Sequence, residues 1–191
     1  MRSEERSITR IMASLIHLPL ASMQPRLHLS RVHRQPASQL RDEIGDYVAV
    51  HESSREDARN LPIEAWSRLI DRFDLPVVQV GRADDSLLPG AMDRRGAPFL
   101  VSAAYLEQAC CFIGINSAMQ RACAAFDVPA VVIFGLTPPS IFAHPSYQVV
   151  QAKSCACYRD LSKAVTCDGP CLNTVSPETV CLAVTSALAE A

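Results

Sequence analysis

Residues 111–135, CFIGINSAMQRACAAFDVPAVVIFG, contain the pattern that decides the fold. Two apolar runs, Cys111–Ile115 and Ala130–Phe134, have the length of buried strands, and the residues between them repeat apolar side chains at helical spacing. A strand, a helix and a second strand in this order are typical of a parallel sheet. Because both runs are apolar without alternation, we expect helices to cover both faces of that sheet.

The same alternation of strands and helices extends over residues 46–191. We expect further strands over residues 47–51, 76–81, 99–101 and 147–150, a loop over 82–97, and helices that begin at Pro62, Ser102 and Ser176. Ser117 and Gln120 are spaced as a capping box for the helix of residues 111–135. These elements predict a doubly wound, Rossmann-like α/β domain, whose ligand would lie at the carboxyl ends of the strands.

Residues 1–45 have a different character. They show no sustained periodicity, and residues 1–41 hold seven arginines but only two acidic residues, a net charge of +5, against −7 for residues 42–191. A basic arm could attract an acidic partner or nucleic acid. We favour a solvated arm or interdomain linker remnant, and we do not expect nucleic acid because no aromatic stacking platform accompanies the charge.

Composition excludes several classes of protein. The 191 residues are 49% hydrophobic and 20% charged, which is typical of one globular domain and not of a disordered chain. No apolar run reaches the roughly 18 residues that a membrane span requires. Glu4, Glu5 and Pro19 disagree with a secretory signal, so we expect a cytoplasmic protein with reduced cysteines.

The segment 51–62, HESSREDARNLP, joins an expected strand to an expected helix. Ser53, Ser54 and Arg59 offer hydroxyls and positive charge beside a helix N-terminus, a combination that suits a phosphate. A plain polar loop is the alternative. We interpret His51 as a structural histidine rather than a ligand. The common glycine-rich signatures for dinucleotides and nucleoside triphosphates, and the hydrolase signature G-x-S-x-G, are absent.

Residues 114–139 resemble glycosyltransferase family 9, which contains the ADP-heptose:lipopolysaccharide heptosyltransferases. Members of that family typically read Asp-(Ser/Thr)-Gly-x-x-His-x-(Ala/Thr)-Ala-Ala-x-x-x-Pro, followed by (Phe/Tyr)-Gly-Pro-Thr-Asp-Pro. The positions that keep register here are Ser117, Ala124, Ala125, Pro129, Gly135, Thr137 and Pro139. Asn116, Ala118 and Arg121 replace the family's Asp, Gly and His, and Leu136 and Pro138 replace its Pro and Asp. The segment 51–62 also matches, since the family often has a Ser/Thr pair, a basic residue and Trp-Pro there.

The resemblance implies the C-terminal, nucleotide-sugar-binding half of a GT-B glycosyltransferase. It implies a donor site, for an ADP-sugar or a similar nucleotide sugar, formed by Ser53, Ser54, Arg59, Asn116, Ser117, Ala118, Met119 and Arg121. It supplies no catalytic residue, because the family's general base lies in the other half. The implied activity is inverting sugar transfer. The alternative is a non-catalytic nucleotide- or sugar-binding remnant, or a subunit that needs a separate acceptor-domain chain or a homo-oligomer.

Four cysteines cluster near the C-terminus, at Cys155, Cys157, Cys167 and Cys171. Two close pairs separated by nine residues could hold a tetrahedral Zn or Fe in the loop of residues 155–171, where a closed four-ligand site would be structural. Unliganded thiols and disulfides are the alternatives. Some family members carry a cysteine cluster here, and autotransporter heptosyltransferases bind iron through one, so the resemblance also implies metal.

Overall fold

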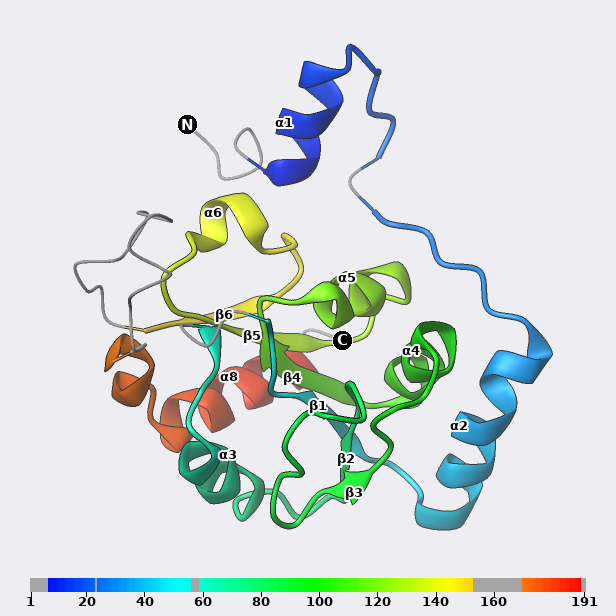
Figure 1. Cartoon of the computed structure of the whole chain (residues 1–191), viewed down its shortest axis with the longest axis vertical. Coiled ribbons are helices and arrows are strands. Elements are labelled where there is room, and N and C mark those ends of the chain that lie inside the picture. Colours follow the sequence, from blue (N-terminus) through cyan, green and yellow to red (C-terminus); the bar gives the residue numbers. More distant parts are fainter. Residues whose placement is uncertain (1–6, 23, 56–58, 153–169, 190–191) are drawn as a thin grey trace.

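A six-stranded, fully parallel sheet forms the centre of the molecule (Figure 1). The computed structural model describes residues 7–22, 24–55, 59–152 and 170–189. Within them the strand order is β3-β2-β1-β4-β5-β6. The strands are β1 (Val48–His51), β2 (Val77–Gln79), β3 (Met92–Asp93), β4 (Cys111–Ile115), β5 (Ala130–Phe134) and β6 (Gln148–Gln151). The sheet reverses its direction of winding between β1 and β4, so the predicted doubly wound fold is confirmed.

Helices cover both faces of this sheet (Figure 1). One core lies under α2 (Arg31–Ile44), α4 (Phe99–Gln108) and α5 (Ala118–Ala125). The other lies under α3 (Ile63–Ile70) and α8 (Pro177–Ala189). Successive side chains of β4 pack on opposite faces of the sheet, so Phe112 lies in the first core and Ile113 in the second. Both strands of the sequence pattern at 111–135 are therefore buried along their whole length.

Three short elements complete the described residues. Helix α1 (Ile8–Leu15) has no buried residue. Helix α6 (Pro139–Phe142) follows β5, and the 3-10 helix η3 (Pro170–Thr174) precedes α8. Across the described ranges, no helix combines the length and the apolar character needed to cross a membrane.

Several local predictions were wrong. Residues 99–101 form the first turn of α4 rather than a strand, because the carbonyl of Pro98 accepts hydrogen bonds from the N–H groups of Val101 and Ser102. The expected loop 82–97 contains the short strand β3. The last helix, α8, buries Val180, Val184 and Ala187, whereas Leu188 at its end is 42% exposed.

The aperiodic N-terminal region also contains more regular structure than we expected. Helix α2 packs against α4 and buries only Ala37 and Leu40, and Pro36 lies inside it. Two buried residues among fourteen give little apolar periodicity, which explains why the sequence pattern did not reveal this helix.

Leu40 tests whether α2 belongs to the folded core. Leu40 is 3% exposed, so Leu40→Ala should lower the free energy of unfolding by about 2–5 kcal/mol. Val32 lies on the same helix but is 74% exposed, and Val32→Ala should change the free energy by less than about 0.5 kcal/mol. Urea denaturation followed by circular dichroism measures both. Equal effects of the two substitutions would contradict the packing of α2 on the core.

Candidate functional site

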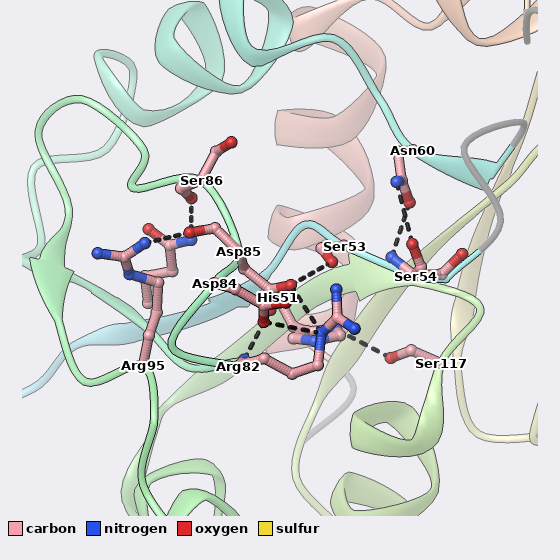
Figure 2. Close-up of polar contacts among 11 residues, drawn as sticks. His51, Ser53, Ser54, Asn60, Arg82, Asp84, Asp85, Ser86, Arg95 and Ser117 are labelled. Atoms are coloured by element: carbon pink, nitrogen blue, oxygen red, sulfur yellow. Dashed lines mark hydrogen bonds and ion pairs between the residues drawn. The ribbon is translucent and has the colours of Figure 1, made fainter.

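The carboxyl ends of β1 and β4 meet at the point where the sheet reverses its winding. His51 ends β1, and Ser117 lies two residues after the end of β4. The Ser117 Oγ lies 3.0 Å from His51 Nδ1 (Figure 2). Ser117 occupies the N-cap position of α5, but its side chain makes no capping hydrogen bond to the first turn of that helix. The N–H groups at the start of α5 therefore lack the side-chain acceptor that an N-cap serine usually provides.

This geometry corrects the predicted capping box. The Gln120 side chain donates to Asn116 Oδ1 rather than returning to the backbone of Ser117. Asn116 in turn donates from Nδ2 to Thr137 Oγ1 over 3.0 Å. Asn116, Gln120 and Thr137 are all buried. The turn between β4 and α5 is thus fixed to the loop that follows β5.

His51 is neutral in the folded protein. It is 8% exposed, and its burial lowers the pKa of the imidazole to about 4, although the carboxylate of Asp85 acts in the opposite direction. At neutral pH, His51 therefore contributes a hydrogen bond to Ser117 without a positive charge. The expectation of a structural histidine agrees with its burial and its contact.

Asp85 joins the loop after β1 to the loop after β2 (Figure 2). Its carboxylate accepts hydrogen bonds from Ser53 Oγ at 2.6 Å, from the Arg82 N–H at 2.6 Å and from Arg82 Nε at 3.0 Å. Burial alone would raise the pKa of Asp85, but the hydrogen bonds from Ser53 and Arg82 outweigh it and lower the pKa. Asp85 is consequently a carboxylate whose hydrogen-bonding capacity is largely used by the protein.

Gly81 permits this close approach. Its φ is +153°, and a Cβ at this position would lie 2.5 Å from Asp85 Oδ2 and 3.3 Å from His51 Cδ2. Any side chain at residue 81 would displace both groups.

A pocket of about 210 Å³ lies between the two loops, and its lining includes Glu52, Ser53, Asn60, Arg82 and Asp85. The sequence pattern did not indicate Glu52, Arg82 or Asp85 as site residues. Their position directly after two predicted strands was the available signal, because strand ends of a parallel sheet share one edge.

The remaining predicted donor-site residues have separate surroundings. The Ser54 N–H donates to Asn60 Oδ1 at 2.7 Å, and Asn60 Nδ2 donates to the Ser54 carbonyl at 3.2 Å (Figure 2). Ala118 and Met119 begin α5. Arg121 donates from Nη2 to the Phe142 carbonyl at 2.6 Å, and burial lowers the pKa of its guanidinium. Arg59 lies between Ser54 and α3 and is half-buried. The structure thus connects Ser117 to the end of β1 through His51, whereas Arg121 is engaged by α6.

The predicted four-cysteine site lies mostly outside the described residues, which include Cys171 but not Cys155, Cys157 or Cys167. Cys171 is buried in the core under α3 and α8. Within the described part of the chain, no group of three or more His, Cys, Asp or Glu side chains could hold a metal ion.

The fold is shared with solved glycosyltransferases. A glycosyl transferase family 9 protein from Veillonella parvula matches with a TM-score of 0.79 and 16% identity, over 100% of this chain and 62% of that chain. Escherichia coli ADP-heptose LPS heptosyltransferase II matches with a TM-score of 0.71 and 15% identity, over 91% of this chain and 56% of that chain. TibC, an iron-containing dodecameric glycosyltransferase from enterotoxigenic E. coli, matches with a TM-score of 0.64 and 20% identity, over 91% of this chain and 49% of that chain.

The chain therefore spans only 49–62% of the length of these three structures. No protein-family model and no curated protein matches the sequence. The Rossmann-like α/β fold expected from the sequence is confirmed, and it is the fold of glycosyltransferases that the motif resemblance implied.

The lowered pKa of His51 has a measurable consequence. An unfolded histidine has a pKa near 6.5, so the unfolded state binds a proton at His51 before the folded state does as the pH falls from 6.5 to about 4. His51 thus contributes stability that is present above pH 6.5 and lost toward pH 4. His51→Gln removes this proton linkage. The unfolding free energy of the wild type should fall relative to that of His51→Gln by about 2–3 kcal/mol over this interval.

Denaturant titrations at pH 7, 5.5 and 4 measure this difference, and an NMR titration of the His51 ring should give a midpoint near 4. A midpoint near 6.5, with parallel pH profiles for the two proteins, would show that the imidazole is not buried as described.

Proposed function

We propose that this chain is the nucleotide-sugar-binding domain of a family 9-like glycosyltransferase and contributes to sugar transfer from a nucleotide-activated donor. The observation that carries the proposal is the start of α5, whose N-cap residue Ser117 makes no side-chain capping hydrogen bond, at the carboxyl edge beside the switch point. Such a helix start attracts an anion through its N–H groups and its dipole. The shared fold and the order of the motifs supply independent support.

In this proposal the donor diphosphate lies at the start of α5. Ser117, Ala118 and Met119 offer backbone N–H groups, and Ser53, Ser54 and Arg59 approach from the segment between β1 and α3. Charge that develops on the leaving diphosphate would be stabilised by these donors during inverting displacement at the anomeric carbon. Asn116, although fixed by Gln120 and Thr137, keeps one lone pair of its Oδ1 and one N–H of its Nδ2 for a hydroxyl of the donor.

The donor class follows from the same comparison. Heptosyltransferase II of the shared fold is an ADP-heptose enzyme, so an ADP-sugar is the first donor to test. Arg121 was expected to help with donor binding, but its bond to Phe142 means that it would act on the donor only after giving up that contact. The proposal assigns no general base and includes the expected cytoplasmic location.

A second candidate is favoured by the partial coverage of the related structures. In it the chain binds a nucleotide or sugar without turnover, or requires a separate acceptor-domain chain or further copies of itself. TibC is dodecameric, which makes a homo-oligomer worth measuring. Sugar transfer by the isolated 191-residue chain would exclude this alternative.

Nucleotide binding tests the proposed donor site. ADP, UDP and GDP are titrated into the protein by calorimetry, and at least one should bind. Arg59→Ala should weaken that binding by about 1.5–3 kcal/mol, as for the loss of a charge-assisted hydrogen bond. Arg68→Ala is the control, because Arg68 is exposed within α3, away from the carboxyl edge, and its loss should leave affinity within about twofold. Failure of all three nucleotides to bind would overturn the donor site.

We also propose that Cys155, Cys157, Cys167 and Cys171 hold one structural Zn or Fe. The spacing of the four thiols and the iron of TibC support this. Aerobically and anaerobically purified protein should contain about one metal per chain, and Cys167→Ser should lower that content and release reactive thiols. Less than about 0.2 metal per chain in both preparations would leave the thiols unliganded.

A further inference from the structure

Glu52 lies in the pocket between the loops that follow β1 and β2, and the proposed diphosphate contacts do not use its side chain. It follows His51 directly and is only 5% exposed. Its Oε2 is buried and has no hydrogen-bond partner among the described residues. A buried carboxylate oxygen without a donor is costly, and native proteins rarely keep one without a reason.

The other acids of the pocket are already engaged. Asp85 accepts three hydrogen bonds, from Ser53 and twice from Arg82. Asp84 lies 3.5 Å from Arg82 Nε and is largely exposed. Glu52 is therefore the buried acid in this pocket with an acceptor oxygen left for another molecule.

The charge of the pocket selects against anions. Glu52, Asp84 and Asp85 face a single lining arginine, Arg82, which is already paired with the two aspartates. A phosphate beside these three acids would be repelled, so in the proposal the diphosphate lies outside the pocket, at the start of α5, and Ser53 and Ser54 border both sites. Among the described residues, no group of three acidic, histidine or cysteine side chains could hold a metal ion. The complementary ligand is neutral and donates hydrogen bonds.

The lining favours a sugar ring among such ligands. A volume of about 210 Å³ suits one five- or six-membered ring. Leu61 and Ile63 offer apolar surface for the C–H face of the ring, while Ser54, Asn60 and Ser86 offer polar groups around it. A ring with several hydroxyls can donate to the carboxylate and accept from neighbouring polar groups.

We infer that Glu52 Oε2 accepts a hydrogen bond from a hydroxyl of a sugar ring bound in this pocket, and that Glu52 thereby determines specificity for the donor. The inference rests on the proposed function and deepens it. The hydroxyl belongs either to the ribose of the nucleotide or to the transferred sugar, and the experiment below separates them.

The electrostatic surroundings of Glu52 give this inference a second readout. Burial, and secondarily the charge of Asp85, raise the pKa of Glu52 to about 7, while its own backbone N–H, Arg95 and Arg82 act in the opposite direction. His51, the neighbouring ionisable group on β1, is neutral at this pH. A hydroxyl donor binds the ionised carboxylate. Affinity should therefore rise about tenfold between pH 6 and pH 8, with uptake of the ligand releasing a proton near pH 7.

The experiment compares wild type with Glu52→Gln by calorimetry at pH 8. The probes are ADP, ADP-glucose, 2′,3′-dideoxyadenosine diphosphate and pyrophosphate. The backbone N–H of Glu52 already bonds its own carboxylate, so the glutamine oxygen is expected there and its NH₂ replaces Oε2. This exchanges an acceptor for a donor. Affinity for the hydroxyl-bearing probe should fall about tenfold, and affinity for pyrophosphate should stay within about twofold.

Glu64→Gln, at an exposed position in the first turn of α3, is the matched control and should change neither affinity. A loss seen with ADP but not with the dideoxy nucleotide assigns the hydroxyl to the ribose, and a loss seen only with ADP-glucose assigns it to the transferred sugar. Thermal melting of Glu52→Gln verifies that the variant folds.

Nucleotides that bind wild type and Glu52→Gln equally, with equal pH profiles, would overturn this inference and leave the proposed function standing. An equal loss for pyrophosphate would also overturn it, because the effect would then not come from a hydroxyl. Failure of every probe to bind the wild type would overturn the proposed function and the sugar pocket together.

Discussion

The parallel pairing of β1 with β4 is the constraint on which the carboxyl edge of the sheet depends. Its register places His51 opposite Gly114. A Cβ at Gly114 would lie 2.3 Å from the Phe112 ring and 3.0 Å from the His51 carbonyl oxygen, so only glycine fits there. This pairing brings the end of β1 beside the start of α5 and allows His51 to hold the Ser117 hydroxyl. The proposed anion site and the pocket beside Glu52 both depend on that arrangement.

The parts of the fold that are predictable from the sequence are those with dense apolar patterns. Strands β4 and β5 were found because all ten of their residues are buried and nearly all are apolar. Helix α2 was missed because its surface is polar, and β3 was missed because two paired residues leave no detectable alternation. Local spacing could therefore define the sheet but not every element around it.

The candidate site shows the same division. Ser53, Ser54 and Ser117 were named from their positions at strand ends and helix starts. The capping box failed because a local rule cannot know that a histidine from another strand competes for the Ser117 hydroxyl. Asp85 was missed for a similar reason, since its link to the loop after β1 depends on Ser53, which lies 32 residues away in the chain. The burial of Glu52, which sets it apart from the other acids of the pocket, likewise follows from the folded structure. Hydrogen bonds between residues that are far apart in the sequence cannot be predicted from the local spacing of residues alone.

The adjacent residues His51 and Glu52 carry opposite pKa shifts, so their contributions to the pH dependence of stability oppose each other. Between about pH 4.5 and 6.5 the folded state takes up fewer protons at His51 and more protons at Glu52 than the unfolded chain does. The two slopes of stability against pH have opposite signs, and the combined contribution of the pair over this interval is small. A substitution at either residue alone removes this compensation and exposes the contribution of the other. A small pH dependence from this pair therefore reflects two opposed pKa shifts and not their absence.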